Sequence, residues 1–223
     1  MSDNKPVLAV IGGTGDLGTG LVYRWARAGY HVVIGSRKAE SAAEAAAAMA
    51  ARVPSATVEG MENSAAAAKA DIVCMTVPFS HQQDTLAVIR EAVQGKLFID
   101  VTVSLKPPKV GTVQLPAEGS AGVIAQATLG EQVKVVSAFQ NIAAAHLNDD
   151  HAIDCDVLVT GDDADARETV VQLAHAAGMK AWHAGPIANS AATEALTSVL
   201  ITLNKRYKIA GGAGIRITGE PSV

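Results

Sequence analysis

The first twenty residues contain the pattern that most constrains the fold. An apolar run, 7–11, leads into a glycine-rich turn and then into a stretch whose apolar residues recur at helical spacing. Gly13, Gly15 and Gly18 complete G-x-G-x-x-G, which permits a tight turn, close approach of backbone to pyrophosphate, and close helix–strand packing. A purely structural glycine turn is the alternative. The order of strand, turn and helix predicts a dinucleotide site in which N–H groups at the helix start hold the phosphate. The cofactor-binding residues expected there are Gly13, Thr14, Gly15, Asp16, Leu17 and Gly18.

The rest of the chain alternates short apolar runs with longer helical stretches, as a parallel sheet with crossover helices requires. We predict strands over 7–11, 30–35, 71–78, 96–103, 134–138, 156–160 and 179–183, with a short one near Thr57, and helices over 17–28, 39–51, 64–70, 81–94, 165–177 and 190–205. Residues 106–122 hold three prolines and several glycines, which predicts an extended loop, either a lid or a substrate loop.

This alternation predicts an α/β protein with a Rossmann-like, doubly wound, mostly parallel sheet. We expect a dinucleotide-binding Rossmann domain over residues 1–138. A smaller α/β part over 139–223 would then complete the site for a second substrate, since only about eighty residues remain and they still alternate.

Composition excludes several classes of protein. With 49% hydrophobic and 18% charged residues among 223, the chain can bury a substantial core. Its formal net charge of −4 and its scattered cations argue against binding of nucleic acid. The polar start, 1–6, leads directly into a strand and no apolar run reaches membrane length, so we expect neither a signal peptide nor a membrane partner.

Cysteine and histidine usage gives two further expectations. Cys74 and Cys155 each lie in an apolar run, which predicts buried free thiols and a reducing, cytoplasmic location. The six histidines show no zinc-ligand spacing, so no metal site is expected.

The end of the second predicted strand selects the nucleotide. NAD-binding folds place Asp or Glu there, roughly twenty residues past the glycines, to bind the adenosine ribose. This chain has Ser36, Arg37 and Lys38 instead, a hydroxyl and two cations that suit the extra phosphate of NADP. The alternative is a polar turn with an exposed arginine.

A third group of residues follows the strand over 71–78 and begins the next helix. This position is the carboxyl edge of the sheet, where open α/β folds bind ligands. Val77 and Pro78 would hold the backbone against the cofactor. His81 would face the site as an acid or base, or it is a solvated residue at a helix start.

With these segments in place, the chain resembles NADPH-dependent F420 reductases, which transfer hydride between NADP and the 8-hydroxy-5-deazaflavin coenzyme F420. The resemblance runs nearly end to end. The segments that carry it are 11–18, 34–37, 77–78, 135–138, 161–163, 185–190 and 211–217.

The resemblance implies NADP and coenzyme F420 as redox partners, a homodimer, and a 2′-phosphate held by Ser36 and Arg37. It also implies a deazaflavin side lined by Pro78, Gln140, Ile142 and Ala143, with Ala138 among the cofactor-binding residues. The chain departs from the family there, because Gln140 replaces a histidine and Ala143 a proline, and Phe79 follows Pro78 where relatives often have tryptophan.

Hydride transfer between stacked rings needs positioning rather than a nucleophile or metal, so no catalytic residue is expected beyond the positioning candidates Gln140 and His81. Two other readings stay open. One is an NADPH-dependent reductase of a small imine, ketone or other redox-active ring, which Gln140, Asn141 or His81 would orient. The other is a non-catalytic NADP-sensing module, suggested by the loss of the family's histidine.

The end of the chain allows two interpretations. Lys205, Arg206, Lys208 or Arg216 would bind the anionic tail of the family's coenzyme, or they form a solvated basic helix end. The glycine-rich stretch 211–217 is either a tail that contacts a partner or a terminal strand that completes the site of its own subunit.

Overall fold

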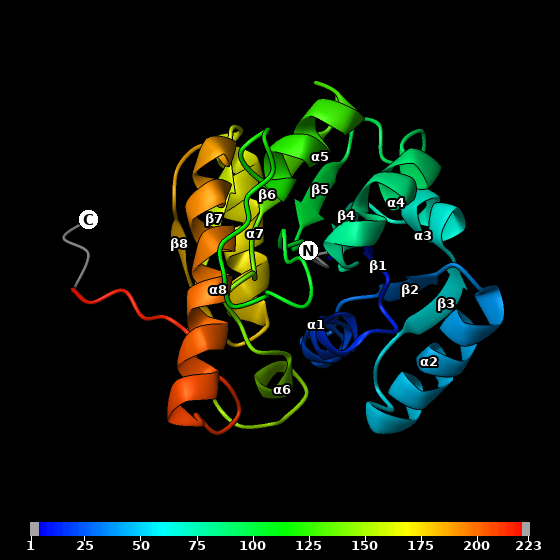
Figure 1. Cartoon of the computed structure of the whole chain (residues 1–223). Coiled ribbons are helices and arrows are strands. Elements are labelled where there is room, and N and C mark those ends of the chain that lie inside the picture. Colours follow the sequence, from blue (N-terminus) through cyan, green and yellow to red (C-terminus); the bar gives the residue numbers. More distant parts are fainter. Residues whose placement is uncertain (1–4, 220–223) are drawn as a thin grey trace.

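The computed structural model describes residues 5–219, whose strands form one eight-stranded sheet in the order β3-β2-β1-β4-β5-β6-β7-β8 (Figure 1). Every pairing is parallel except that of β6 with β7, which confirms the predicted mostly parallel Rossmann-like sheet. The strands are β1 Leu8–Ile11, β2 Val32–Ser36, β3 Val58–Glu62, β4 Ile72–Met75, β5 Leu97–Asp100, β6 Lys134–Ser137, β7 Asp156–Gly161 and β8 Lys180–His183.

Helices cover both faces of this sheet. One face is packed by α1 (Asp16–Arg27), α2 (Ala39–Arg52) and α7 (Ala164–Ala176). The other face is packed by α3 (Asn63–Lys69), α4 (Gln82–Ile89) and α5 (Ala121–Leu129). The short helix α6 (Ala144–Leu147) contacts α1, and the long α8 (Ser190–Tyr207) contacts α5 and β7.

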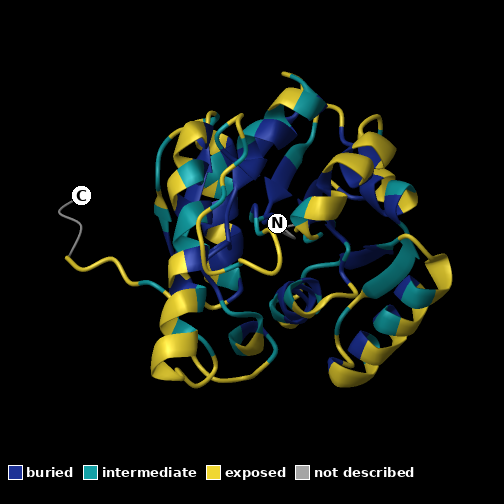
Figure 2. Cartoon of the chain, viewed as in Figure 1, coloured by how far each residue is buried: buried dark blue, intermediate teal, exposed yellow. Residues whose placement is uncertain are grey.

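The central strand explains why the first apolar run is continuous. All residues of β1 are buried, with Leu8 and Val10 in the core beneath α1 and α2, and Ala9 and Ile11 in the core beneath α3 and α4. A strand with polar residues at alternate positions would place polar side chains in one of these two cores, so both faces of β1 have to be apolar. Figure 2 shows the buried strands at the centre and exposed outer helix faces.

Two helices were not predicted from the sequence, and one predicted helix is shorter than expected. The missed helices are α5 and α6, and α4 ends at Ile89 instead of continuing to residue 94. Helix α5 has no clear polar face, because it is buried between the sheet and α8, and such a helix lacks the amphipathic period that identifies helices in a sequence. Residues 101–120 contain no helix or strand, in line with the predicted loop.

The sheet continues across the predicted division at residue 138. Ser137 at the end of β6 pairs with Thr160 of β7, so strands from both parts belong to one sheet. On the α1 side, the Arg24 guanidinium donates to the backbone carbonyls of Leu147 and His151, each at 3.1 Å. The division into 1–138 and 139–223 remains a prediction.

The glycine-rich tail lies against its own subunit. The Ile215 carbonyl accepts from the N–H of Asp156 at 2.8 Å, and the N–H of Ile217 donates to the Asp156 carboxylate at 2.8 Å. Arg216 forms an ion pair with Asp154 at 3.0 Å. Within residues 5–219, no helix is long and apolar enough to cross a membrane.

Candidate functional site

A cavity of about 730 Å³ lies at the carboxyl edge of the central strands, where open α/β sheets bind ligands. Its walls come from the turn between β1 and α1, the end of β2, the start of α3, the connection from β4 to α4, and the segment after β5. From the predicted site residues it gathers Thr14, Gly15, Asp16, Leu17, Ser36, Arg37, Val77, Pro78 and His81.

The glycine turn leaves room for a phosphate. A Cβ on Gly18 would lie 2.7 Å from both Gly13 Cα and Thr76 Oγ1, so helix α1 packs this closely only with glycine there. A Cβ on Gly15 would meet nothing closer than the Gly12 carbonyl at 3.7 Å, because that side is open. Gly15 also caps α1 without a side-chain hydrogen bond, which leaves the first N–H groups of the helix for an anion.

The end of β2 offers a cation and a hydroxyl. Ser36 is half-buried and Arg37 exposed, and both line the cavity, whereas Lys38 does not. The carboxylate nearest in register is that of Glu62, which accepts from the N–H of Ser64 at 3.1 Å as the cap of α3. Among residues 5–219, Arg37 has no ion-pair partner, so its guanidinium is available to a phosphate.

The opposite end of the cavity is mostly apolar. Thr76 donates to the Ile11 carbonyl at 3.0 Å, which ties the segment after β4 to β1. Val77, Pro78 and Phe79 follow, and a short 3-10 helix, Phe79–His81, leads into α4 with His81 exposed. The facing wall is made by Val101, Thr102, Val103, Leu105, Pro107 and Val110.

Of the residues expected on the deazaflavin side, Pro78 lines the cavity, whereas Gln140, Ile142 and Ala143 do not, and neither does Ala138. Ala138 and Ile142 belong to the core, and Ala143 is half-buried against Gly212. Gln140 is buried, and its amide donates to the Asp100 carbonyl at 3.0 Å and to Ser137 Oγ at 2.7 Å. Gly13 and Gly18 do not line the cavity either, but their close approach lets α1 pack against the glycine turn.

Sequence reasoning missed several lining residues, above all Asn63, Thr85 and Thr102. Asn63 follows β3 directly and Thr102 lies two residues past β5. Their position just beyond the carboxyl ends of parallel strands was the signal that could have identified them.

Two of these side chains support a polar ligand. Asn63 is 5% and Thr102 2% exposed, yet Asn63 Oδ1 and Thr102 Oγ1 have no hydrogen-bond partner within the described chain. Buried polar atoms without partners are rare in proteins and mark places where another molecule is expected. Together with the open helix start and the available Arg37, they fit a dinucleotide with an extra phosphate.

The cysteines offer no reactive group. Cys74 and Cys155 are both free and buried, as predicted, and burial raises the pKa of each thiol. Thiols in such surroundings stay protonated and unreactive. Within residues 5–219 no group of three His, Cys, Asp or Glu side chains is arranged to hold a metal ion.

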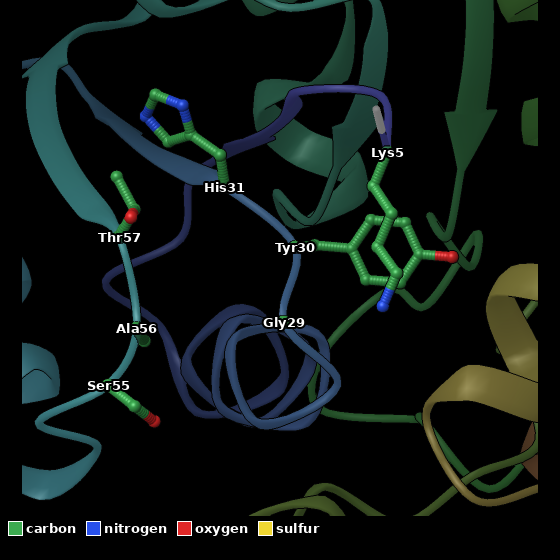
Figure 3. A pocket seen from close by; sticks show the side chains of 7 residues that line it. All are labelled: Lys5, Gly29, Tyr30, His31, Ser55, Ala56 and Thr57. Atoms are coloured by element: carbon green, nitrogen blue, oxygen red, sulfur yellow. The ribbon is translucent and has the colours of Figure 1, made fainter. Parts of the chain in front are cut away.

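A second hollow of about 330 Å³ lies at the opposite, amino edge of the sheet, next to Lys5, Tyr30 and His31 (Figure 3). Its two basic side chains, Lys5 and His31, are already engaged. The Lys5 ammonium lies 4.9 Å from the centre of the Tyr30 ring and donates to the Ala28 carbonyl. His31 Nε2 lies 2.7 Å from Glu59 Oε1. This hollow presents no free charged group to a ligand.

Comparison with known proteins agrees with this geometry. The family model described as "NADP oxidoreductase coenzyme F420-dependent" matches residues 7–104. An F420-dependent NADP reductase of Methanothermobacter thermautotrophicus is 43% identical over 96% of this chain and 95% of its own length. One from Methanocaldococcus jannaschii is 39% identical over 95% and 97%.

Solved structures agree in fold. A putative F420-dependent NADP reductase from Arthrobacter sp. FB24 superimposes with a TM-score of 0.76 at 24% identity, covering 93% of this chain and 97% of that one. A pyrroline-5-carboxylate reductase from Coxiella burnetii does so with a TM-score of 0.60 at 14% identity, covering 94% and 72%. Given the two curated relatives matched along nearly their whole length, the chain belongs to the family of F420-dependent NADP reductases.

Proposed function

We propose that this chain is an oxidoreductase that transfers hydride between NADP(H) and coenzyme F420. The observation that carries the proposal is one cavity with two different ends. Ser36 and the unpaired Arg37 lie at one end, and the apolar walls after β4 and β5 lie at the other. The names of the full-length relatives supply the second redox partner.

Each end of the cavity has its own task. Arg37 and Ser36 would bind the 2′-phosphate, and the N–H groups at the start of α1 would bind the pyrophosphate. Val77 and Pro78, with Val101 and Val103 opposite, would hold two flat rings in contact and exclude water between them. NADPH supplies the hydride when bound, so the side chains need only bind, orient and shield.

The other predicted contacts are part of the same proposal. Lys38, next to Arg37, would add positive charge near the phosphate. Ala138, Gln140, Ile142 and Ala143 do not line the cavity, so any contribution they make to the deazaflavin side would be indirect. Lys38 and these four residues therefore rank below the lining residues as contacts, and His81 ranks above Gln140 as a positioning candidate because it lines the cavity.

The decisive experiment mixes purified protein, NADPH and F420 and follows the visible absorbance of the deazaflavin. Catalytic bleaching with NADPH, and far slower bleaching with NADH, is the expected result. If NADPH binds tightly but F420 is never reduced, the proposal fails. Oxidation of NADPH by a cyclic imine or a ketone would then identify the other class of reductase.

We also propose a homodimer that pairs through α8. The helix turns polar residues inward, among them Ser190, Glu194 and Ser198, while Val199 and Leu203 on its outer side are 45% and 36% exposed. Val199 and Leu203 lie one helical turn apart and so are adjacent on this face, and adjoining exposed apolar side chains support a surface that another molecule covers. Light scattering should give twice the chain mass, and Leu203→Glu should give the monomer.

We further propose a cytoplasmic location, which the two buried free thiols support because they suit a reducing compartment. Fractionation of the source cells tests it, since recovery from the soluble cell interior is expected and recovery from the culture medium would contradict it.

A further inference from the structure

One buried side chain outside the cavity lining connects the two segments that form its apolar walls. Gln82 is the first residue of α4, directly after the wall segment 76–81, and it is fully buried. Its Nε2 donates to Asp100 Oδ2 at 2.7 Å and to the Ala121 carbonyl at 2.9 Å. One amide group therefore links α4 to the end of β5 and to the start of α5.

Asp100 connects this amide to the opposite wall. It is the last residue of β5 and fully buried, and its Oδ1 accepts from the N–H of Thr102 at 2.8 Å. That hydrogen bond fixes the first residues of the wall segment 101–110. One oxygen of the Asp100 carboxyl group thus accepts a hydrogen bond from Gln82, and the other accepts one from Thr102 in the facing wall.

The far end of the same link is held by α8. Both oxygens of Glu194 accept hydrogen bonds from the start of α5, from the N–H of Ala121 at 2.9 Å and from that of Gly122 at 3.0 Å. Ser120 and Ser190 reinforce this contact with a hydrogen bond of 2.6 Å between their hydroxyls. These hydrogen bonds anchor the start of α5 to α8, independently of Gln82.

We propose that Gln82 is a positioning residue that sets the spacing between the two cavity walls, and so the distance between hydride donor and acceptor. This inference rests on the proposed hydride transfer. A misplacement of about 1 Å in a reacting pair can lower the rate about 100-fold, so a group that fixes the wall spacing affects the rate without touching either ring.

The link depends on a donor at position 82. The only hydrogen bonds of the Gln82 amide are those of its Nε2, because Gln82 Oε1 has no partner in the described part of the chain. Gln82→Leu removes the donor and leaves a buried carboxyl oxygen of Asp100 unpaired. Gln82→Glu restores one donor while it is protonated, and burial beside Asp100 favours that form, so its function should be lost as the pH rises.

The test compares wild type with Gln82→Leu by binding as well as turnover. The dissociation constant of NADP⁺, measured by calorimetry, should change less than about threefold, because the phosphate contacts lie at the other end of the cavity. The turnover number with F420 should fall about 30- to 100-fold. The deuterium isotope effect with NADPH labelled at the transferred position should rise as hydride transfer becomes slower.

Gln126→Leu is the matched control. Gln126 lies on α5, and its amide donates to the carbonyls of Gly130 at 2.9 Å and Val133 at 3.0 Å, which places it away from the cavity. Its loss should lower the melting temperature with little change in turnover or isotope effect. Gln82→Glu should regain turnover as the pH falls, whereas wild type and Gln126→Leu should not.

Each adverse result has a distinct meaning. Unchanged turnover in folded Gln82→Leu, or an equal loss in Gln126→Leu, overturns the role of Gln82 and leaves the proposed function intact. A wild-type chain that binds NADP⁺ but never reduces F420 overturns the proposed function, and the role of Gln82 falls with it.

Discussion

Glu194 of α8 accepts a hydrogen bond from the N–H of Gly122 at 3.0 Å, although the two residues lie 72 positions apart. The carboxyl group is 1% exposed and also accepts from Ala121. Burial raises its pKa from 4.5 to about 8, against the opposing effect of these hydrogen bonds. The C-terminal helix therefore holds the start of α5 through a carboxyl group whose pKa is raised by burial.

This pKa predicts a pH dependence of stability. Because folding raises this pKa, Glu194 contributes most to the free energy of unfolding below pH 4.5, the pKa in the unfolded chain. This stabilisation is lost as the pH rises through about 8. The melting temperature should fall between pH 5 and pH 9 partly for this reason. Glu194→Gln should be less stable at pH 5 but flatter across this range. Parallel curves for the two proteins would contradict the assignment.

Arg37 should decide between NADPH and NADH. Arg37→Ala removes a charge-assisted pair with the 2′-phosphate and should raise the KM for NADPH about 10- to 100-fold, with little effect on NADH. Lys38→Ala is the control. Because Lys38 does not line the cavity, this substitution should raise the KM for NADPH much less than Arg37→Ala does. Equal effects on both nucleotides would show that Arg37 acts elsewhere. Steady-state kinetics with each nucleotide measures the contrast.

Two glycines should fail in different ways. Gly18→Ala forces a Cβ to within 2.7 Å of backbone and should lower the free energy of unfolding by about 1–3 kcal/mol. Gly15→Ala should fold normally, because its Cβ has room, but should weaken NADP⁺ binding by occupying the phosphate space. Thermal melts and calorimetric titrations separate these outcomes. Normal NADP⁺ affinity in Gly15→Ala would place the pyrophosphate elsewhere.

Asp16 lines the cavity, but its negative charge should weaken the binding of NADP⁺. Its carboxylate lies in the first turn of α1 and lines the cavity, where it repels a phosphate bound at the same helix start. Asp16→Asn should therefore tighten NADP⁺ binding about two- to fivefold, most clearly at low ionic strength. Asp165→Asn, in the first turn of α7 and outside the cavity, should leave binding unchanged. Weaker binding in Asp16→Asn would indicate that the carboxylate binds the ribose instead.

The sequence predicted some of the residues that line the cavity and missed others. The phosphate end comes from Gly13, Gly15, Gly18 and the Ser36–Arg37 pair, whose spacing is local and therefore readable in order along the chain. Asn63 and Thr102 were missed because they reach the cavity only through the pairing of β3 with β2 and of β5 with β4. Gln140 was expected at the cavity from family resemblance, yet its amide binds the backbone of Asp100.

The sequence by itself determined the strand–turn–helix start, the preference for NADP, the α/β alternation and the family, because each depends on residues close together in the chain. Tertiary structure alone decided that α5 is a helix, that its first N–H groups bind Glu194, and that Gln82 bridges Asp100 and Ala121. These features have no local signal. They arise because buried polar groups must find partners, and only the folded sheet brings those partners within hydrogen-bonding distance.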